Sequence, residues 1–297
     1  MKSASPAISA GGNMAKQRFS SVETDERCGL TLKEFKRHLD FENKSNHTIR
    51  AYLFTVRQFF ELYPSVTPEN LLLYKCYLID HYQPQTVNLR IRTINSYVEF
   101  LELPYTKILM VRHRQKSFLE NVISQADYEY LKNCLQRDGH YMYYFAVRFM
   151  AATGLRISEL IQLTAEDVKQ GYIEVYSKGN RMRRVYIPRL LQESCLQWLA
   201  EISRHTGYVF LNRFGRQITD TGIRDQLKQF AIRYNLEPTV VYPHTFRHLF
   251  AKNFIEQCDD IAMLSDILGH GNIETTRIYL HRSSSEQQHM FNQIVNW

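Results

Sequence analysis

The sequence has few cysteines, and their spacing excludes the sites that cysteines usually build. The five cysteines, Cys28, Cys76, Cys134, Cys195 and Cys258, lie far apart along the chain. A small disulfide-stabilised domain has a dense framework of cysteines, and a zinc site needs Cys-x-x-Cys or a similar cluster. We therefore expect a protein of the reducing cytoplasm, with neither a disulfide framework nor a zinc site.

Long apolar runs are also missing. The longest aromatic stretch, YMYYFAVRFMAA, is interrupted by Arg148, and the N-terminal residues include Lys2 but no apolar signal core. A membrane helix needs about 18 or more predominantly apolar residues, so we expect no membrane span and no secretion signal. No nucleotide-binding glycine loop, metal-ligand cluster or acidic triad stands out either. The expected location is the cytoplasm.

Basic residues are in modest excess over acidic ones. The net charge is +7 with a pI near 9.1, which is typical of proteins with a polyanionic partner such as nucleic acid. Residues 1–21 and 102–118 each carry an excess of +3, whereas 22–101 are balanced and 119–297 carry +1. Contact between DNA and the two globular parts would therefore require charge to be segregated onto one face.

Length and composition predict two domains. The chain has 297 residues, of which 44% are hydrophobic and 13% aromatic, as in well-packed globular proteins. Residues 1–21, rich in Ser, Ala and Gly, are expected to be a disordered lead-in. Residues 22–101 predict an N-terminal helical domain and 102–121 a basic linker. A second domain over 122–285 and a C-terminal segment over 286–297 follow.

Apolar periodicity predicts four helices in the N-terminal domain. Positions spaced at three and four residues mark one face of each helix, and the sequence Thr67-Pro68-Glu69 is a typical helix start. The second half is expected to be helical too, with alternating strands over Tyr172–Tyr176 and Arg183–Ile187. The predicted fold is mainly α with a small β-sheet.

The stretch from Tyr242 to His281 carries the chemistry. It places His244 and Arg247 at positions i and i+3 of a helix, followed by Leu-Gly-His ending in His270 and by Tyr279. Upstream, Arg156 lies in the run Gly-Leu-Arg-x-x-Glu-Leu. In this order and at these spacings, the residues resemble the tyrosine recombinase (phage-integrase) family in its compact two-domain type.

The resemblance implies a fold and an activity. It implies an N-terminal core-binding (SAM-like) domain and a catalytic domain that together clamp double-stranded DNA. It implies a site-specific recombinase that cuts and rejoins DNA through a 3′-phosphotyrosine intermediate, for integration, excision or resolution. Because that intermediate conserves the energy of the broken bond, no cofactor and no metal are expected. The expected assembly is a tetramer of two dimers on paired sites, nucleoid-associated when bound to DNA.

The resemblance also gives roles to named residues. Arg156 and Arg247 would bind the scissile phosphate, since a guanidinium is a planar, permanently charged fork of donors. Tyr279 would be the nucleophile, and His244 and His270 would divide the tasks of general base and phosphate hydrogen bonding in either order. Lys178, in the predicted turn between the strands, would protonate the leaving oxygen. Glu159 would not touch the substrate but would hold an arginine or a histidine in place.

Several further arginines are candidates for contact with DNA. They are Arg90, Arg112, Arg114, Arg181 and Arg183. Those of the linker would supply affinity without sequence information, although a solvated connector explains them equally well. Those of the predicted hairpin would contact phosphate, or would keep an edge strand soluble.

Other functions fit parts of the pattern. A type IB topoisomerase uses similar catalytic residues but relaxes DNA as a monomer, and a catalytically silent relative would act as a DNA-binding regulator. The apolar residues of 286–297 fit packing into a neighbouring subunit, or docking onto the same chain. Element integrase, dimer resolvase and invertase all remain open, as do the target sequence and any accessory DNA-bending protein.

Overall fold

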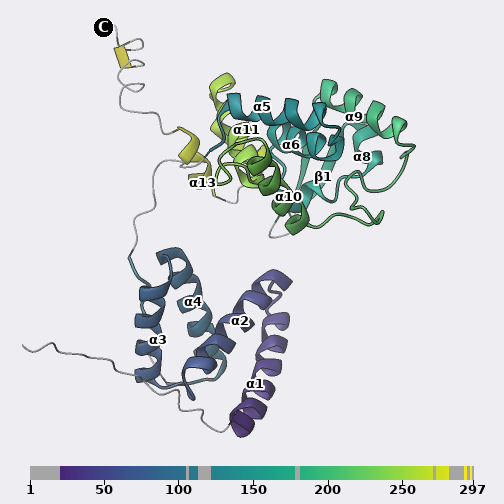
Figure 1. Cartoon of the computed structure of the whole chain (residues 1–297). Helices are drawn as coiled ribbons and strands as arrows, with labels where there is room; N and C mark the ends of the chain where they lie inside the picture. The colour runs from purple at the N-terminus through teal and green to yellow at the C-terminus, as the bar shows by residue number, and fades with distance from the viewer. Residues whose placement is uncertain are drawn as a thin grey trace, which may run out of the picture. The chain divides into compact units, whose positions relative to one another are not determined.

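The computed structural model describes residues 21–104, 107–112, 122–177, 181–269, 272–280, 291–292 and 295. The chain forms two compact units, of which unit 1 extends to Gln115 and unit 2 begins at Lys116. Helices dominate both units in Figure 1, and unit 2 also contains a two-stranded antiparallel sheet. The predicted fold class, mainly α with a small sheet, is confirmed. None of the described helices is long and apolar enough to cross a membrane.

The described part of unit 1 contains four helices, as the periodicity predicts. They are α1 (Ser21–Phe41), α2 (Asn46–Leu62), α3 (Pro68–His81) and α4 (Pro84–Phe100). Side-chain oxygens cap two of them: Ser45 accepts from the Thr48 amide and Thr67 from the Asn70 amide, both at 3.2 Å. Each cap satisfies a backbone donor that has no partner within the helix, which fixes where the helix begins.

Aromatic rings fill the core of unit 1. Phe59 on α2 meets Tyr74 on α3 edge to face with ring centroids 5.2 Å apart, and Phe35 on α1 meets Tyr97 on α4 at 5.0 Å. All four side chains are buried. Edge-to-face packing aligns the positive rim of one ring with the negative face of the next, which adds to the gain from burial.

The first half of the predicted linker is fixed to α4. The side-chain amide of Asn95 accepts from the Ile108 amide and donates to the Ile108 carbonyl, both at 2.9 Å. Asn88 does the same with Val111, at 2.8 and 3.0 Å. Each asparagine thus satisfies both backbone groups of an extended residue. Residues 107–112 therefore belong to unit 1, whereas the sequence predicts a connector.

Unit 2 carries the remaining described elements. Its helices before the sheet are α5 (Gln125–Arg137), α6 (Tyr141–Thr153), α7 (Ile157–Leu160) and α8 (Ala165–Gln170). The sheet consists of β1 (Tyr172–Ser177) and β2 (Arg181–Tyr186). The elements after it are α9 (Arg189–Glu201), α10 (Asp220–Arg233), α11 (Pro243–Gln257), α12 (Ile261–Leu268), α13 (Glu274–Arg277) and the 3₁₀ turn η1 (Ile278–Leu280).

Helices α6 and α11 pack against each other in the interior of unit 2. Phe149 on α6 and Phe246 on α11 are completely buried. The buried hydroxyl of Thr245 accepts a hydrogen bond of 2.7 Å from the Ile123 amide, which ties the segment before α5 to α11. This packing fixes the first turns of α11, where His244 and Arg247 lie.

The sheet presents two different faces. Its register pairs Tyr172 with Tyr186 and Val175 with Arg183. Because side chains alternate along a strand, Val175 and Arg183 point to the buried face, while Tyr186 is exposed on the other. Arg183 is therefore an arginine on the inner side of the hairpin.

Candidate active site

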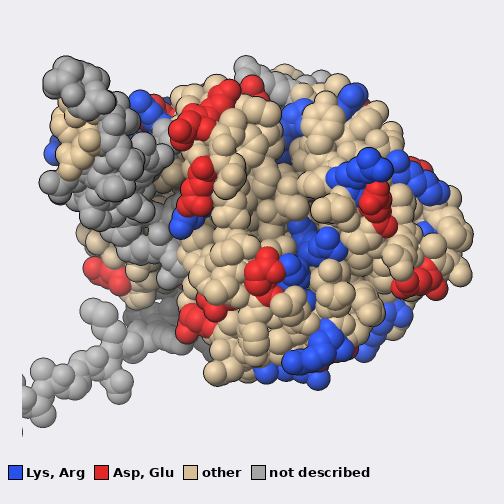
Figure 2. Space-filling view, turned by 90° about the horizontal axis from the view of Figure 1, so that it is seen from above, with Lys and Arg blue, Asp and Glu red and all other residues tan. Residues whose placement is uncertain are grey.

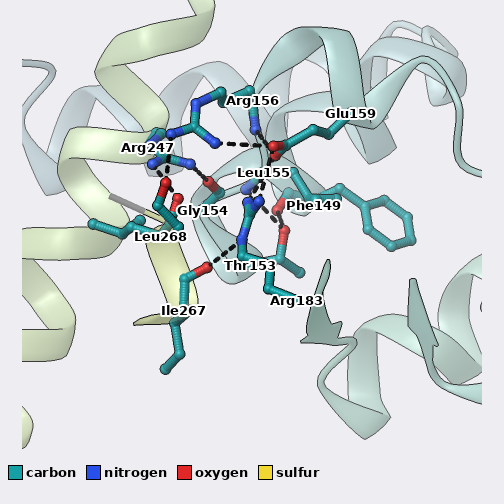
Figure 3. Close-up of polar contacts among 11 residues, drawn as sticks. Phe149, Thr153, Gly154, Leu155, Arg156, Glu159, Arg183, Arg247, Ile267 and Leu268 are labelled. Carbon is teal, nitrogen blue, oxygen red and sulfur yellow. Dashed lines mark hydrogen bonds and ion pairs between the residues drawn. The ribbon is translucent and has the colours of Figure 1, made fainter. Parts of the chain in front are cut away.

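Arg247 lies near the start of α11 and is almost completely buried, with 1% of its surface exposed. A buried guanidinium needs acceptors, because an unsatisfied charge inside a protein is strongly destabilising. Its Nη1 donates to the Gly154 carbonyl and its Nη2 to the Leu268 carbonyl, each at 2.6 Å (Figure 3). Arg247 thus connects the C-terminal ends of α6 and α12 to α11.

Gly154 permits this arrangement. It ends α6 in the left-handed conformation, with φ +65°. A Cβ atom at this position would lie 2.6 Å from Cδ1 of Phe250 and 2.9 Å from Cδ2 of Leu268. Both the backbone conformation and the close approach of α11 therefore require glycine. The predicted Gly-Leu-Arg box is explained physically by this turn.

Arg156 follows the turn and occupies the N-cap position of α7. Its Nη2 donates to the Gly269 carbonyl at 3.2 Å. Since Arg247 donates to Leu268, the two guanidinium groups bind consecutive carbonyls at the end of α12. The Arg156 side chain is 34% exposed, so it is the more accessible of the two.

Glu159 holds Arg156 from the other side. Its carboxylate accepts from the Arg156 backbone amide at 2.8 Å and from Arg156 Nη1 at 3.0 Å. The same carboxylate accepts from Arg183 Nη1 and Nη2 at 3.0 and 2.9 Å. Burial opposes ionisation of Glu159, but the hydrogen bonds and charge of Arg183, and then those of Arg156, outweigh it and lower its pKa. Arg183 therefore holds Glu159 in place, and Glu159 in turn positions Arg156.

The structure gives Arg183 a different place from the predicted one. The sequence makes it a DNA-binding candidate, but its side chain is only 9% exposed and binds both oxygens of Glu159. Its Nε also donates to the Ile267 carbonyl at 2.9 Å. Because the inward register of β2 takes this guanidinium into the interior, Arg183 supports the site from within and is not presented to solvent.

The network of Figure 3 carries an excess of positive charge: it contains the three guanidinium groups of Arg156, Arg183 and Arg247 but one carboxylate, that of Glu159, which accepts from Arg156 and Arg183. Burial, and next the charge of Arg156, lowers the pKa of Arg247 to about 10. Arg247 therefore stays protonated at neutral pH while repelling its neighbour. An anion bound near Arg156 and Arg247 would offset that repulsion.

Tyr279 packs against α11 through an apolar cluster. It lies on η1, is 9% exposed, and belongs with Ala251, Ile255, Leu264 and Leu268 to one buried group. Its hydroxyl is hydrogen-bonded to Nδ1 of His248, with 2.6 Å between the two atoms. Burial raises the pKa of Tyr279 to about 12, against an opposing effect of Arg247. The phenol is therefore protonated at neutral pH.

His248 and His244 lie on one side of α11, one helical turn apart, with ring centroids separated by 4.8 Å. Burial, and then the charges of His244 and Arg247, lowers the pKa of His248 to about 4. His244 has an exposed side chain, and its pKa is lowered by partial desolvation and then by Arg247 and Arg156. Among the described residues, the imidazole that contacts the Tyr279 hydroxyl is that of His248.

The remaining DNA-binding candidates lie in different settings. Arg112 is exposed. Arg90 is half-buried in unit 1, where its guanidinium stacks 4.1 Å from the ring centre of Tyr82 and its buried Nη1 has no hydrogen-bond partner. Stacking on an aromatic face stabilises a cation, but it leaves Arg90 less accessible than the sequence indicates.

Other predicted positions lie outside the described residues. They are Lys178, His270, Arg114, the side chain of Arg181 and most of the segment 286–297. His270 directly follows Gly269, whose carbonyl accepts from Arg156.

Two features of the site are missing from the sequence-based prediction. The first is the contact between His248 and Tyr279, for which a signal existed: His244 and His248 are spaced by four residues and so share a helix face. The second is the pairing of Arg183 with Glu159, which depends on the inward register of β2.

The face shown in Figure 2 is of mixed charge, and the described residues provide no metal site. Figure 2 shows clusters of Lys and Arg side chains on the face in view, with Asp and Glu side chains among them. Within the described part of the chain, no group of three or more His, Cys, Asp or Glu side chains is arranged to hold a metal ion.

Comparison with known proteins finds a family and relatives. Residues 121–286 match the model of the phage integrase family. The tyrosine recombinase XerD of Staphylococcus haemolyticus is 33% identical over 156 residues, which cover 50% of this chain and 52% of XerD. The chain spans about half the length of the curated relatives it matches.

Two solved structures are similar over most of the chain. The Tn1549 transposon integrase in complex with transposon right end DNA matches with a TM-score of 0.70 at 16% identity, covering 90% of this chain and 98% of that one. The XerH site-specific recombinase bound to its difH substrate matches with a TM-score of 0.65 at 16% identity, covering 93% and 90%. At such identities the likeness establishes the fold.

Proposed function

Because the chain belongs to the phage integrase family, we propose that it is a site-specific recombinase that cuts and rejoins DNA strands through a 3′-phosphotyrosine intermediate. One observation carries the proposal. Arg156 and Arg247 bind the consecutive carbonyls of Gly269 and Leu268, and Tyr279 packs on the helix that carries Arg247. Residues far apart in the sequence thus form one positively charged site beside a tyrosine hydroxyl.

The arginines suit the chemistry of a phosphodiester. Attack on phosphorus adds negative charge to the nonbridging oxygens, and fixed donors aimed at that charge lower the barrier. Glu159 and the carbonyl of Gly269 hold the guanidinium of Arg156 before DNA binds. Arg247 is fixed in the same way by two carbonyls. Both groups therefore need little reorganisation during the reaction.

Tyr279 is the proposed nucleophile. Its oxygen would form the 3′-phosphotyrosine bond while the 5′ oxygen leaves. The phosphotyrosine bond then conserves the energy of the broken phosphodiester bond. Lys178 is proposed to protonate the 5′ oxygen, and His244 and His270 are proposed to divide general-base catalysis and hydrogen bonding to the phosphate between them, in either order. No ATP, metal or other cofactor is needed for this sequence of steps.

The proposed partners are double-stranded DNA and further copies of this chain. The matched relatives are named tyrosine recombinases, and two neighbours are structures with DNA, which favours recombination over relaxation of supercoils. A tetramer of two dimers on paired sites, with 286–297 packing into a neighbouring subunit, is part of the proposal. So is action in the cytoplasm, on DNA of the nucleoid.

The test is recovery of DNA covalently bound to the protein in cells. After rapid denaturation, DNA attached to the wild-type protein is sequenced, which also identifies the site. A nicked duplex of that site is then incubated with purified protein, and the adduct is measured on a denaturing gel. We expect an adduct with the wild type and none with Tyr279→Phe, which keeps the ring in its apolar cluster but lacks the oxygen.

Tyr234→Phe is the matched control. Tyr234 is a second buried tyrosine of unit 2, and its hydroxyl donates to Asp138 at 3.0 Å. We expect this variant to form the adduct normally. Adduct formation by Tyr279→Phe at the wild-type yield would refute the assignment of the nucleophile.

A further inference from the structure

We propose that His248 exchanges the proton of Tyr279, accepting it when the tyrosine attacks DNA and returning it when the strand is rejoined. This inference rests on the proposed function and adds to it a residue that the motif does not contain. The motif assigns proton transfer at the tyrosine to a histidine of the set His244 and His270. The geometry of α11 and η1 favours the neighbour of Arg247 instead.

The hydrogen bond is the first observation. Nδ1 of His248 and the hydroxyl oxygen of Tyr279 are 2.6 Å apart, and their ring centroids are 5.6 Å apart. The two residues come from different elements, which pack against each other. A general base must lie within hydrogen-bond reach of the proton that it takes, and His248 fulfils this condition before DNA is bound.

The charge states define the direction of the bond. A low pKa keeps the imidazole of His248 neutral at physiological pH, and a high pKa keeps the phenol of Tyr279 protonated. A neutral imidazole has one nitrogen that accepts, and the phenol supplies the proton. We therefore assign the phenol as donor and Nδ1 as acceptor, with the imidazole proton on Nε2.

His244 completes a path to solvent. Its ring contacts His248 at a centroid distance of 4.8 Å, and its side chain is exposed. The order from the interior outwards is therefore Tyr279, His248 and His244. In this arrangement His244 can face the phosphate, while His248 exchanges the proton of the nucleophile.

The proton moves during the attack and not before it. As the bond from the Tyr279 oxygen to phosphorus forms, that oxygen becomes more acidic, and its proton passes to Nδ1 of His248. The bond from phosphorus to the 5′ oxygen breaks, and this oxygen takes a proton from Lys178. Burial is the main cause of the low His248 pKa, and the charges of His244 and Arg247 add to it. The negative charge of the phosphate, held near Arg247, offsets these charges. Rejoining reverses each transfer.

The rejoining half of the reaction gives a test that separates proton transfer from packing. Tyr279→Ala removes the phenol ring, and site DNA bearing a 3′-phenyl phosphate supplies it again as a leaving group. A second DNA carries a 3′-(4-nitrophenyl) phosphate, whose leaving group is a far weaker base and departs without a proton. Joining of each DNA to a 5′-hydroxyl strand is measured under single-turnover conditions.

His248→Asn and His248→Ala are each combined with Tyr279→Ala. Asparagine places an amide near the position of Nδ1 and keeps a hydrogen bond, but it does not carry a proton. We expect both histidine variants to join the phenyl substrate about 10²-fold or more slowly than Tyr279→Ala alone. On the nitrophenyl substrate we expect their rates to be nearly equal to that of Tyr279→Ala alone. His205→Ala, which removes an exposed histidine of unit 2, is the control and should change neither rate.

The outcomes separate the inference from the proposed function. Equal losses on both substrates, or a normal rate for His248→Asn on the phenyl substrate, would mean that His248 only positions the tyrosine. The inference would then be wrong while the proposed function stands. Failure of Tyr279→Ala alone to join the nitrophenyl substrate would overturn both, because the arginine site would then lack strand-joining chemistry.

Discussion

Arg183 binds both carboxylate oxygens of Glu159, at 3.0 and 2.9 Å, in the interior of unit 2. This contact joins β2 to α7, and through Glu159 it extends to Arg156. An exposed ion pair of the same type lies one residue along the strand, where Arg184 binds Glu174 at 2.8 Å. The Arg183 pair is buried and bidentate, whereas the Arg184 pair is exposed and joined by Nη2 to one oxygen, so Arg184 serves as the exposed control.

We expect Arg183→Ala to lower the free energy of unfolding of unit 2 by about 3–5 kcal/mol, because the carboxylate of Glu159 loses its bidentate partner inside the protein. Arg184→Ala should have a much smaller effect, since its pair is exposed to solvent. Urea denaturation, followed by Trp198 fluorescence in a Trp297→Phe background, measures both. Equal small losses would show that Arg183 does not support the site.

Arg156→Lys and Arg247→Lys should each reduce single-turnover cleavage by about 10²–10³-fold, by analogy with the loss of one donor at an oxyanion site. A lysine keeps the charge but does not reproduce the fork that reaches two acceptors. The control is Arg204→Lys, since Arg204 also donates to a carbonyl, that of Val209, at 2.8 Å. A near-normal rate for either site variant would remove that arginine from the phosphate site.

Gly154→Ala should destabilise unit 2 more than the backbone conformation alone explains. The left-handed conformation costs an alanine about 1–2 kcal/mol. The clash with Phe250 and Leu268 should add about 1–3 kcal/mol. Gly139 is the matched control, because its φ is +76° and nothing lies within 4 Å of its added Cβ. Similar losses for Gly154→Ala and Gly139→Ala, by urea denaturation, would contradict the close approach of α11.

The stability of unit 2 should decrease as the pH is lowered, partly because of His248. Its folded pKa, about 4, lies below the unfolded value of about 6.5, so the unfolded state binds more protons between these pH values. The favourable contribution is complete above about pH 6.5 and is lost progressively down to about pH 4. The groups facing the imidazole are His244, Arg247 and Tyr279.

His248→Asn removes this titration and leaves that of His244 in place. We expect the variant to lose less unfolding free energy than the wild type between about pH 7 and about pH 5, by roughly 1–2 kcal/mol. Urea denaturation at the two pH values, again with Trp198 as the probe, gives the comparison. Parallel losses in the two proteins would place the His248 pKa close to its ordinary value.

Local patterns in the sequence predict much of the architecture. The start of α3 at Pro68 follows from a capping threonine and a proline, and the end of α12 at Gly269 follows from a left-handed glycine. The apolar positions of the helices in unit 1 are those of its core. These features depend on neighbours in the chain, so helical periodicity and capping chemistry are enough to predict them.

The positions of charged groups in space could not be predicted in the same way. The sequence offers Arg183 as one of several basic residues near a turn, and a shift of one residue in the register of β2 would turn it towards solvent. The choice of His248 as the partner of Tyr279 depends on how η1 packs against α11 through a few apolar side chains.

The helical class, the small sheet and the set of residues that resembles the recombinase motif all follow from local patterns in the sequence. Three contacts depend on how distant elements pack: Arg156 and Arg247 bind consecutive carbonyls, Arg183 binds Glu159, and the Tyr279 hydroxyl meets His248. The difference lies in the range of the interactions. Periodicity and caps act over a few residues, whereas burial, register and hydrogen bonding between distant elements arise only when the whole of unit 2 is packed.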